Sequence, residues 1–263
     1  MIEVIGHGGA AAYHPSNSLA SFETALRLGC DRIECDLQAT SDRVLVLAHD
    51  DKIKLSDGRL HHIRELPARR VCASESGIIT FDALVELAGG VPLMIDIKRR
   101  GYEAEALEAI RRHGLARASS VSSTYATTLR SIRAHFPAMQ LGLSTGHWAS
   151  SVSMRYGHQV MKTLLRVAVP FPLFSVLRLT GATEANLQYE IVTRPLVAAL
   201  HAGGWRVNVW TVDHSTAIER AIAARVDGVI SNRPDLVDSI RLSTPASGST
   251  LSPSDHPTPL DVR

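Results

Sequence analysis

The first 50 residues place two imidazoles and two carboxylates on strand-like runs of apolar sequence. His7 ends the first run and His49 ends the third. On the second run Glu34 and Asp36 stand two residues apart, so their side chains point to one face of a strand and Cys35 points to the other. The carboxyl ends of parallel barrel strands converge on one mouth, where all four groups would meet. We therefore predict a single metal-dependent hydrolytic site.

A fourth strand-like run repeats this spacing with Asp96 and Lys98. Carboxylates that face a protein interior cost several kcal/mol each unless another charge compensates them. A divalent cation with oxygen ligands would do so, and Lys98 as an ion-pair partner is the alternative that the sequence leaves open. The hard, acidic ligand set favours Mg²⁺ or Ca²⁺ over zinc.

Two histidines beside such a site suit phosphodiester cleavage. One imidazole can take a proton from the attacking oxygen while the other gives a proton to the leaving oxygen. A cation and Lys98 would neutralise charge on the non-bridging phosphate oxygens. An inactive barrel that binds phosphodiesters or a protein partner, and a barrel enzyme of another class such as an isomerase, are the competing hypotheses.

The elements that must position these groups alternate between strand-like and helix-like periodicity. Parallel strands need crossover connections, and about eight β-then-α units predict an α/β fold, a (β/α)8 TIM barrel. A doubly wound sheet is the alternative, but His7-Gly8-Gly9 does not match its glycine-rich phosphate turn. The predicted strands are 3–6, 31–37, 44–48, 92–97, 119–122, 140–143, 185–189, 205–212 and 228–231, and the predicted helices are 18–28, 81–88, 103–112, 125–135, 194–202 and 215–224.

Three stretches break this alternation. Residues 50–80 are long and polar, and we expect a loop over the barrel mouth. Residues 150–180 carry apolar helical surface interrupted by prolines at 170 and 172. Residues 243–263 are rich in Ser, Thr and Pro, which predicts a disordered tail. We therefore expect one barrel domain over 1–242 and a tail over 243–263.

The bulk properties exclude several classes of function. The net charge of +2 argues against a dedicated nucleic-acid surface, so we expect a small-molecule phosphodiester substrate and no nucleic-acid partner. Three cysteines without metal-type spacing fit a reducing compartment. The first residues show no secretory signal, and no apolar run is long enough for a membrane helix. We expect a cytoplasmic protein, and the sequence does not indicate an oligomeric state.

The motifs occur in an order that resembles the glycerophosphodiester phosphodiesterase family, whose members are phosphatidylinositol-phospholipase-C-like TIM barrels. The resemblance spans about residues 3–240 with family-like spacing. It rests on His7-Gly8-Gly9 with Pro15-Ser16-Asn17-Ser18-Leu19-Ala20-Ser21-Phe22, on the runs 33–40 and 46–51, on Met94-Ile95-Asp96-Ile97-Lys98, and on the closing runs 207–212 and 226–235.

The resemblance implies metal-dependent hydrolysis of glycerophosphodiesters to an alcohol and glycerol 3-phosphate. By resemblance, His7 and His49 are the general acid/base pair, and Glu34, Asp36 and Asp96 bind the divalent metal. Substrate binding falls to Lys98 at the phosphate, to Trp210 in the pocket and to Asn17 near the first histidine. Barrel packing for Trp210 and helix capping for Asn17 are the alternative interpretations.

Three positions depart from the family pattern. Gly8 stands where an arginine is usual, Ser16 replaces an acidic residue, and Asp96 replaces a glutamate. The enzyme could clamp phosphate more weakly, with rescue by Arg99, Arg100 or an arginine within 50–80. It could instead act on a lysophospholipid, or it could be a low-activity or inactive phosphodiester-binding paralogue.

Residues 155–179 mix apolar and basic side chains. Such a stretch could make weak contact with an anionic membrane surface. Ordinary packing of a barrel helix beside a proline-marked loop explains the same pattern, and we favour that interpretation.

Overall fold

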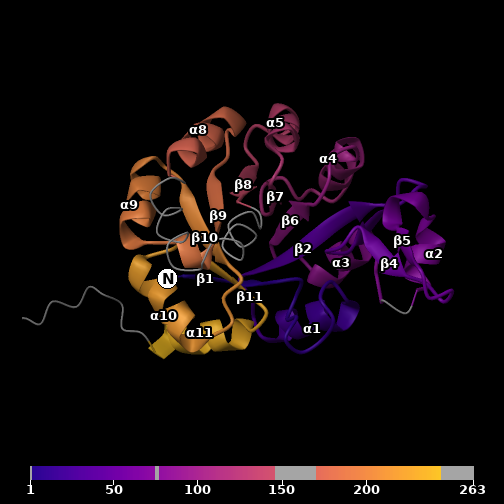
Figure 1. Cartoon of the computed structure of the whole chain (residues 1–263), viewed down its shortest axis with the longest axis horizontal. Coiled ribbons are helices and arrows are strands. Elements are labelled where there is room, and N and C mark those ends of the chain that lie inside the picture. The colour runs from indigo at the N-terminus through magenta and orange to yellow at the C-terminus, as the bar shows by residue number, and fades with distance from the viewer. Residues whose placement is uncertain (1, 75–76, 146–169, 244–263) are drawn as a thin grey trace, which may run out of the picture.

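The computed structural model describes residues 2–74, 77–145 and 170–243. Eight parallel strands form a closed barrel, because β1 pairs with both β2 and β11 (Figure 1). This confirms the predicted TIM barrel. The barrel strands are β1 (Glu3–Gly6), β2 (Arg32–Ala39), β6 (Leu93–Ile97), β7 (Ser120–Ser123), β8 (Gln140–Ser144), β9 (Glu184–Gln188), β10 (Arg206–Trp210) and β11 (Gly228–Ser231).

Helices follow the barrel strands in turn and form the outer layer. Four of the predicted helices match the structure at both ends. The sequence indicated apolar helical surface over residues 150–180, where α8 lies, but gave no bounds for a helix, and α11 was not predicted. A helix tolerates proline in its first turn, where no N–H has an intrahelical acceptor, so the prolines at 170 and 234 begin helices. The outer helices are α1 (Leu19–Arg27), α3 (Phe81–Ala88), α4 (Glu103–Arg112), α5 (Ala126–His135), α8 (Pro170–Thr180), α9 (Arg194–Ala202), α10 (Ser215–Ala224) and α11 (Pro234–Ser243), with a 3-10 turn η2 (Tyr189–Ile191) before α9.

The third predicted strand is not a barrel strand, which corrects the sequence interpretation. The short strand β3 (Leu45–Leu47) runs antiparallel to the end of β2, with Leu37 opposite Leu47 and Ala39 opposite Leu45. The barrel neighbour of β2 is β6. A parallel crossover needs a dozen or more residues, and the five residues between these two strands allow only a hairpin.

Residues 50–80, which we call the insert, are folded rather than a loop over the mouth. They form β4 (Lys52–Lys54), β5 (Leu60–His62), a 3-10 turn η1 (Ile63–Glu65) and α2 (Ala68–Cys72), and lie beside the barrel next to the end of β2 (Figure 1). The insert has its own small core around Ile53, Ile63 and Val71. The expectation of a loop over the barrel mouth was therefore wrong, since three-residue strands are too short to show a clear period.

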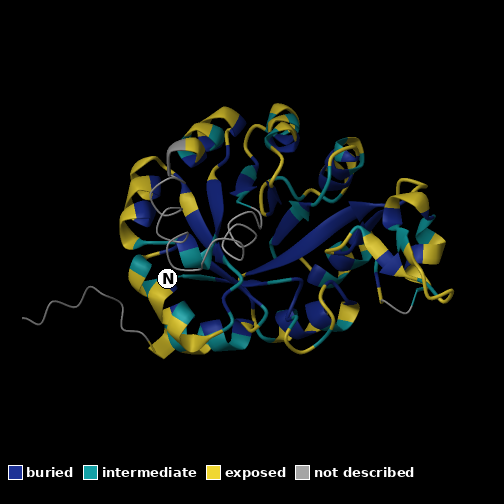
Figure 2. Cartoon of the chain, in the orientation of Figure 1, coloured by how far each residue is buried: buried dark blue, intermediate teal, exposed yellow. Residues whose placement is uncertain are grey.

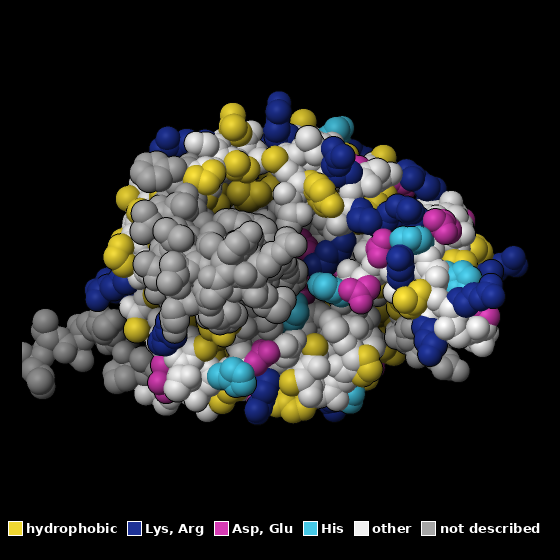
Figure 3. Space-filling view, in the orientation of Figure 1, with side chains coloured by type: hydrophobic (Ala, Val, Ile, Leu, Met, Phe, Trp, Pro, Cys, Tyr) yellow, Lys and Arg dark blue, Asp and Glu magenta, His cyan; other side chains and the backbone are white. Residues whose placement is uncertain are grey.

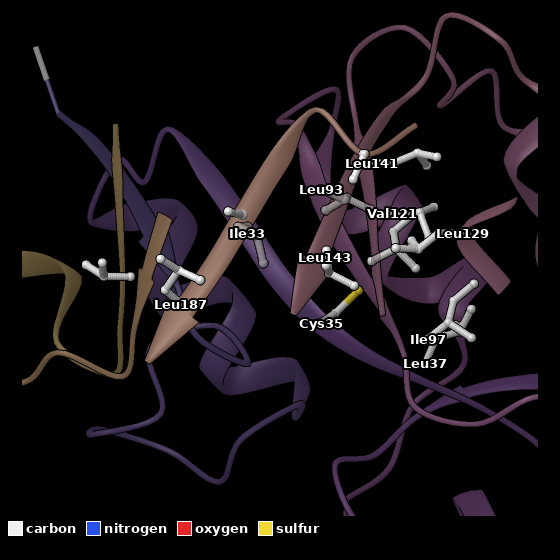
Figure 4. Close-up of a cluster of buried hydrophobic side chains, with 14 of the residues drawn as sticks. Ile33, Cys35, Leu37, Leu93, Ile97, Val121, Leu129, Leu141, Leu143 and Leu187 are labelled. Carbon is white, nitrogen blue, oxygen red and sulfur yellow. The ribbon is translucent and has the colours of Figure 1, made fainter. Parts of the chain in front are cut away.

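Side chains along β2 alternate between the barrel interior and the helix layer, so all eight residues of the strand are buried. The chemically active residues Glu34 and Asp36 lie on the inner side. The outer residues pack in the main hydrophobic cluster between strands and helices, which includes Ile33, Cys35 and Leu37 (Figure 4). Most residues of the barrel strands are buried, and the exposed residues of the helices lie on their outer sides (Figure 2).

The amino end of the barrel is closed by its own ion pairs. Arg32 Nε lies 2.9 Å from Glu3 Oε1, and Arg32 Nη1 lies 3.1 Å from Glu184 Oε1. Arg32 also donates to Ser120 Oγ at 2.9 Å. The charges at this end are therefore compensated by protein partners, which leaves the carboxyl end as the place where a ligand could be needed.

Two sequence predictions fall partly or wholly outside the described residues. The tail lies beyond residue 243, and residues 155–169 of the apolar and basic stretch are also outside. The remainder of that stretch is in α8, which buries Leu173 and Leu177 against the barrel. Within the described ranges no helix is long and apolar enough to span a bilayer.

Candidate active site

The carboxyl ends of three neighbouring barrel strands carry the predicted acidic and basic groups. Asp36 on β2 is directly opposite Asp96 on β6, and Glu34 lies one pleat earlier on β2. Lys98 follows β6 directly. His7 follows β1, the strand that closes the barrel against β2. Parallel register therefore brings these groups together as the sequence predicted.

Glu34, Asp36 and Asp96 form a compact acidic cluster. One oxygen from each carboxylate lies within 4.8 Å of the others. Lys98 Nζ is 2.7 Å from Asp36 Oδ1 and 2.5 Å from Asp96 Oδ2, so both interpretations offered by the sequence share the same groups. Three carboxylates and one ammonium leave a formal charge of −2. A divalent cation would neutralise that charge, and an all-oxygen ligand set suits Mg²⁺ or Ca²⁺.

The pKa values show where the charge is least compensated. Burial raises the pKa of Glu34 well above its ordinary value, and the negative charge of Asp36 raises it further. Burial also acts to raise the pKa of Asp36, but the charge and hydrogen bond of Lys98 outweigh it and lower the pKa to about 2. Lys98 thus compensates the negative charge of Asp36 better than that of Glu34. The missing positive charge is therefore needed most beside Glu34.

The two histidines reach the site from different parts of the fold. His7 Nδ1 lies 2.8 Å from Asn232 Oδ1, an atom placed by the end of β11. His49 follows β3 at the base of the insert, and its Nδ1 lies 2.9 Å from Asp50 Oδ1. Both imidazoles line the same cavity, so the structure brings them together although only one comes from a barrel strand.

This cavity has a volume of about 900 Å³ and is lined by both polar and apolar residues. Glu34, Asp96 and Lys98 are among its polar lining residues, with the two histidines. The apolar lining residues include Met94, Leu143, Leu173, Val176, Trp210 and Ile230, and Met94 is the sheet partner of Glu34. On the face drawn in Figure 3, acidic, basic and histidine side chains gather near the centre, with hydrophobic side chains above them. A ligand with one charged and one apolar part fits such a cavity.

Comparison with known proteins identifies the family. The sequence model of the glycerophosphoryl diester phosphodiesterase family matches residues 7–236. The chain belongs to this family. It is therefore a phosphoric diester hydrolase, a glycerophosphodiester phosphodiesterase.

Similar proteins cover nearly the whole chain. A glycerophosphodiester phosphodiesterase of Caldanaerobacter subterraneus subsp. tengcongensis is 24% identical over 257 residues, which is 90% of this chain and 97% of the relative. One from Bacillus altitudinis is 25% identical over 260 residues, with 92% and 98% covered. The fold matches an Oleispira antarctica phosphodiesterase solved with the product sn-glycerol-3-phosphate, at a TM-score of 0.74, 21% identity and coverage of 91% and 96%.

Gly8, where the family resemblance leads one to expect arginine, has a backbone conformation that favours glycine in this phosphodiesterase, and a side chain there would require Ser16 to move. Its φ is +50°, and a Cβ added there would lie 1.9 Å from Ser16 Oγ. Its N–H instead donates to Glu34 Oε2 at 2.8 Å. The two departures at positions 8 and 16 are therefore linked, because the serine hydroxyl occupies the space that a side chain at position 8 would enter.

Arg99 is the one of the arginines considered as replacements that lines the cavity among the described residues. Its Nε donates to Gln38 Oε1 at 3.0 Å. Arg100 instead lies over the Tyr125 ring at 5.9 Å. In the described part of the insert, no arginine lines the cavity. Gln38 and Arg99 are thus site residues for which the sequence offered only a weak signal, their adjacency to Asp36 and Lys98.

Asn17 is buried, and its amide group is committed to Asp36. Its Nδ2 donates to Asp36 Oδ2 at 2.6 Å, and its Oδ1 accepts from the Asp36 backbone N at 3.0 Å. The capping alternative was wrong, since Ser18 caps α1. Asn17 is not part of the described cavity lining, whereas Trp210 is. These two hydrogen bonds orient Asp36, so Asn17 supports the acidic cluster without lining the cavity.

Proposed function

We propose that the chain hydrolyses a glycerophosphodiester to an alcohol and glycerol 3-phosphate, with His7 and His49 as the acid/base pair. The observation that carries this proposal is the shared cavity, where both imidazoles meet Glu34, Asp96 and Lys98. The product bound to the Oleispira antarctica phosphodiesterase supports it by analogy of fold and family.

The acidic cluster would hold the divalent cation, with Glu34, Asp36 and Asp96 as ligands. The donor chemistry fits, because three close carboxylates carry more negative charge than Lys98 compensates. When bound, Mg²⁺ or Ca²⁺ supplies positive charge to the non-bridging phosphate oxygens.

The protein's own groups supply the remaining chemistry. Lys98 and Arg99 bring positive charge to the phosphate, which a catalyst needs most in the transition state. One histidine accepts a proton from the attacking water as the water oxygen bonds to phosphorus. The other donates a proton to the alcohol oxygen as the bond from phosphorus to that oxygen breaks. Trp210 offers a flat wall against which the glycerol or alcohol portion packs.

The test is hydrolysis of glycerophosphocholine and related diesters with Mg²⁺, Ca²⁺ or Mn²⁺. His7→Ala and His49→Ala are each expected to lose at least about 100-fold in kcat, the usual contribution of a general acid or base. His135→Ala is the matched control, because His135 is exposed and bonds to the Ser131 carbonyl of its own helix. Full activity in either cavity variant would contradict the proposal.

A lysophospholipid is a second candidate substrate, favoured by the apolar lining residues of the cavity. Leu173 and Val176 of α8 line the cavity together with Met94 and Ile230. Val176→Asn is expected to lower kcat/KM for lysophosphatidylcholine and leave that for glycerophosphocholine nearly unchanged. An equal effect on both substrates would exclude acyl recognition by these residues. Ligand-induced stabilisation without turnover under every cation would instead favour the phosphodiester-binding paralogue.

A further inference from the structure

Asp213, beyond the end of β10, is joined to His7 through Asn232. Asp213 Oδ1 accepts from the Asn232 backbone N at 2.8 Å and from Ser231 Oγ at 3.0 Å. Asp213 Oδ2 accepts from Asn232 Nδ2 at 2.7 Å. Asn232 Oδ1 then lies 2.8 Å from His7 Nδ1. All three residues are only partly exposed.

The carboxylate decides which way the amide group points. The oxygen and nitrogen of an asparagine amide differ little in shape, so a hydrogen-bond network is needed to tell them apart. An ionised carboxylate can only accept, so the NH₂ group of Asn232 must face Asp213. The amide oxygen of Asn232 must then face His7.

This orientation determines where the neutral imidazole carries its hydrogen. An amide oxygen has no hydrogen to donate, so His7 Nδ1 must carry the hydrogen in their contact. His7 Nε2 then bears the lone pair. We propose that Asp213 and Asn232 are positioning residues that hold His7 in the tautomer whose Nε2 accepts a proton, which makes His7 the base of the pair. This inference rests on the proposed function.

The proton transfers balance in this assignment. Nε2 of His7 takes a proton from the attacking water as the new oxygen–phosphorus bond forms. His49 gives its proton to the alcohol oxygen as the old oxygen–phosphorus bond breaks. The resulting imidazolium of His7 keeps its Nδ1–H on Asn232, whose NH₂ group remains on a carboxylate that favours the added positive charge.

A reciprocal exchange of the two side chains tests the proposal. In Asp213→Asn the new amide offers both a donor and an acceptor, so Asn232 is free to turn its NH₂ group toward His7. That contact favours hydrogen on Nε2, which cannot then accept a proton. We expect kcat to fall about 100-fold with KM nearly unchanged, as for loss of a general base.

The double variant Asp213→Asn/Asn232→Asp should restore most of the lost kcat. Its carboxylate at 232 accepts from His7 Nδ1 and from the new amide at 213, so His7 Nδ1 remains the donor to residue 232 while donor and acceptor are exchanged between 213 and 232. Ser231→Ala is the matched control, since it removes a different hydrogen bond to Asp213. It leaves both side-chain contacts of Asn232 in place, the one with Asp213 and the one with His7. We expect its kcat to stay close to that of the unaltered protein.

The tautomer itself can be read from the nitrogen resonances of ¹⁵N-labelled histidine at about pH 8.5, where an ordinary imidazole is neutral. The His7→Gln spectrum identifies the His7 signals. A hydrogen on Nδ1 supports the proposal, whereas a hydrogen on Nε2 overturns it, even if Asp213→Asn fails to fold. Unchanged kcat in Asp213→Asn, or a folded double variant that is no more active than the single one, also overturns it. Undiminished activity of His7→Ala would contradict the proposed function instead.

Discussion

The two histidines of the cavity lie in contrasting parts of the molecule. His7 follows a barrel strand, and its partner Asn232 is held in turn by Asp213. His49 follows a short antiparallel strand, and its side chain is 50% exposed beside an Asp50 that is 82% exposed. The barrel therefore fixes one imidazole through a chain of hydrogen bonds, whereas the insert carries the other on a more open segment.

Strand β2 connects these two regions. Its barrel portion supplies Glu34 and Asp36, and its last residues pair with β3, which leads directly to His49. The small core of the insert is separate from the main core of the barrel. In this fold the barrel positions the charge cluster, while His49 is positioned by a smaller unit that packs beside the same strand.

The largest effect is expected from the barrel side of this comparison. Glu34→Gln should lower kcat by at least about 1,000-fold even with excess cation, since it removes a proposed metal ligand whose charge is otherwise uncompensated. Chelation of divalent cations should abolish turnover of the unaltered protein, and added Mg²⁺ or Ca²⁺ should restore it. Glu86→Gln, a change in α3 outside the cavity lining, is the control. Turnover that survives both chelation and Glu34→Gln would remove the metal from the mechanism.

Acid titration of the metal-free protein should separate the two carboxylates of β2. The folded-state pKa of Asp36 is lowered to about 2, so its contribution to stability is present above the unfolded value of ~3.9. About 2–3 kcal/mol is lost as the pH falls toward 2. Glu34 has the opposite sign, because its raised pKa makes its ionisation destabilising as the pH rises through that value.

Thermal unfolding over this pH range provides the measurement. Asp36→Asn should remove the loss of stability on the acidic side, and Glu34→Gln should remove the loss at higher pH. Stabilisation by Mg²⁺ or Ca²⁺ should increase as Glu34 loses its proton, since the ligand must be ionised to bind. A cation effect that is independent of pH in this range would contradict the assignment of Glu34.

Arg99 tests whether the barrel side also supplies the phosphate contact that Gly8 lacks. Arg99→Met should lower kcat/KM by about 30-fold, as expected for loss of one charged contact in a desolvated site. Arg100→Met is the matched control, because Arg100 stacks on Tyr125 outside the cavity lining. Equal activity of the two variants would show that the phosphate is held without an arginine.

The same substitution in the insert core and in the main core tests whether the insert controls His49 independently of the barrel. Ile63 and Ile132 are both fully buried, the first in the insert core and the second on α5 in the main core. Ile63→Ala should reduce kcat about tenfold, because it loosens the insert that directly follows His49. The temperature of global unfolding should change little. Ile132→Ala should lower the unfolding temperature and leave kcat of the folded protein unchanged. The reverse pattern would show that the insert does not control His49.

The barrel and most of the acidic cluster were predictable because both depend on local periodicity. The i, i+2 spacing of Glu34 with Asp36 and of Asp96 with Lys98 places each pair on one face of its strand, and the structure confirms that these faces meet. The helices 81–88 and 103–112 were predicted at their observed ends, since an apolar stripe and clear terminal residues mark them. The short connection between β2 and β3 also implied that β3 is antiparallel. The regular alternation of strand-like and helix-like segments led instead to the prediction of a barrel strand.

The surroundings of these groups could not be predicted from the sequence, because they depend on tertiary contacts. His7 and Asn232 are 225 residues apart, and they meet because barrel closure pairs β1 with β11. The filling of the space at Gly8 by Ser16, the place of Arg99 in the cavity lining and the delivery of His49 by the insert likewise depend on which segments pack together. The alternation of side chains along a strand depends on neighbouring residues, so it can be recognised in the sequence. These contacts instead depend on closing long loops around a common core.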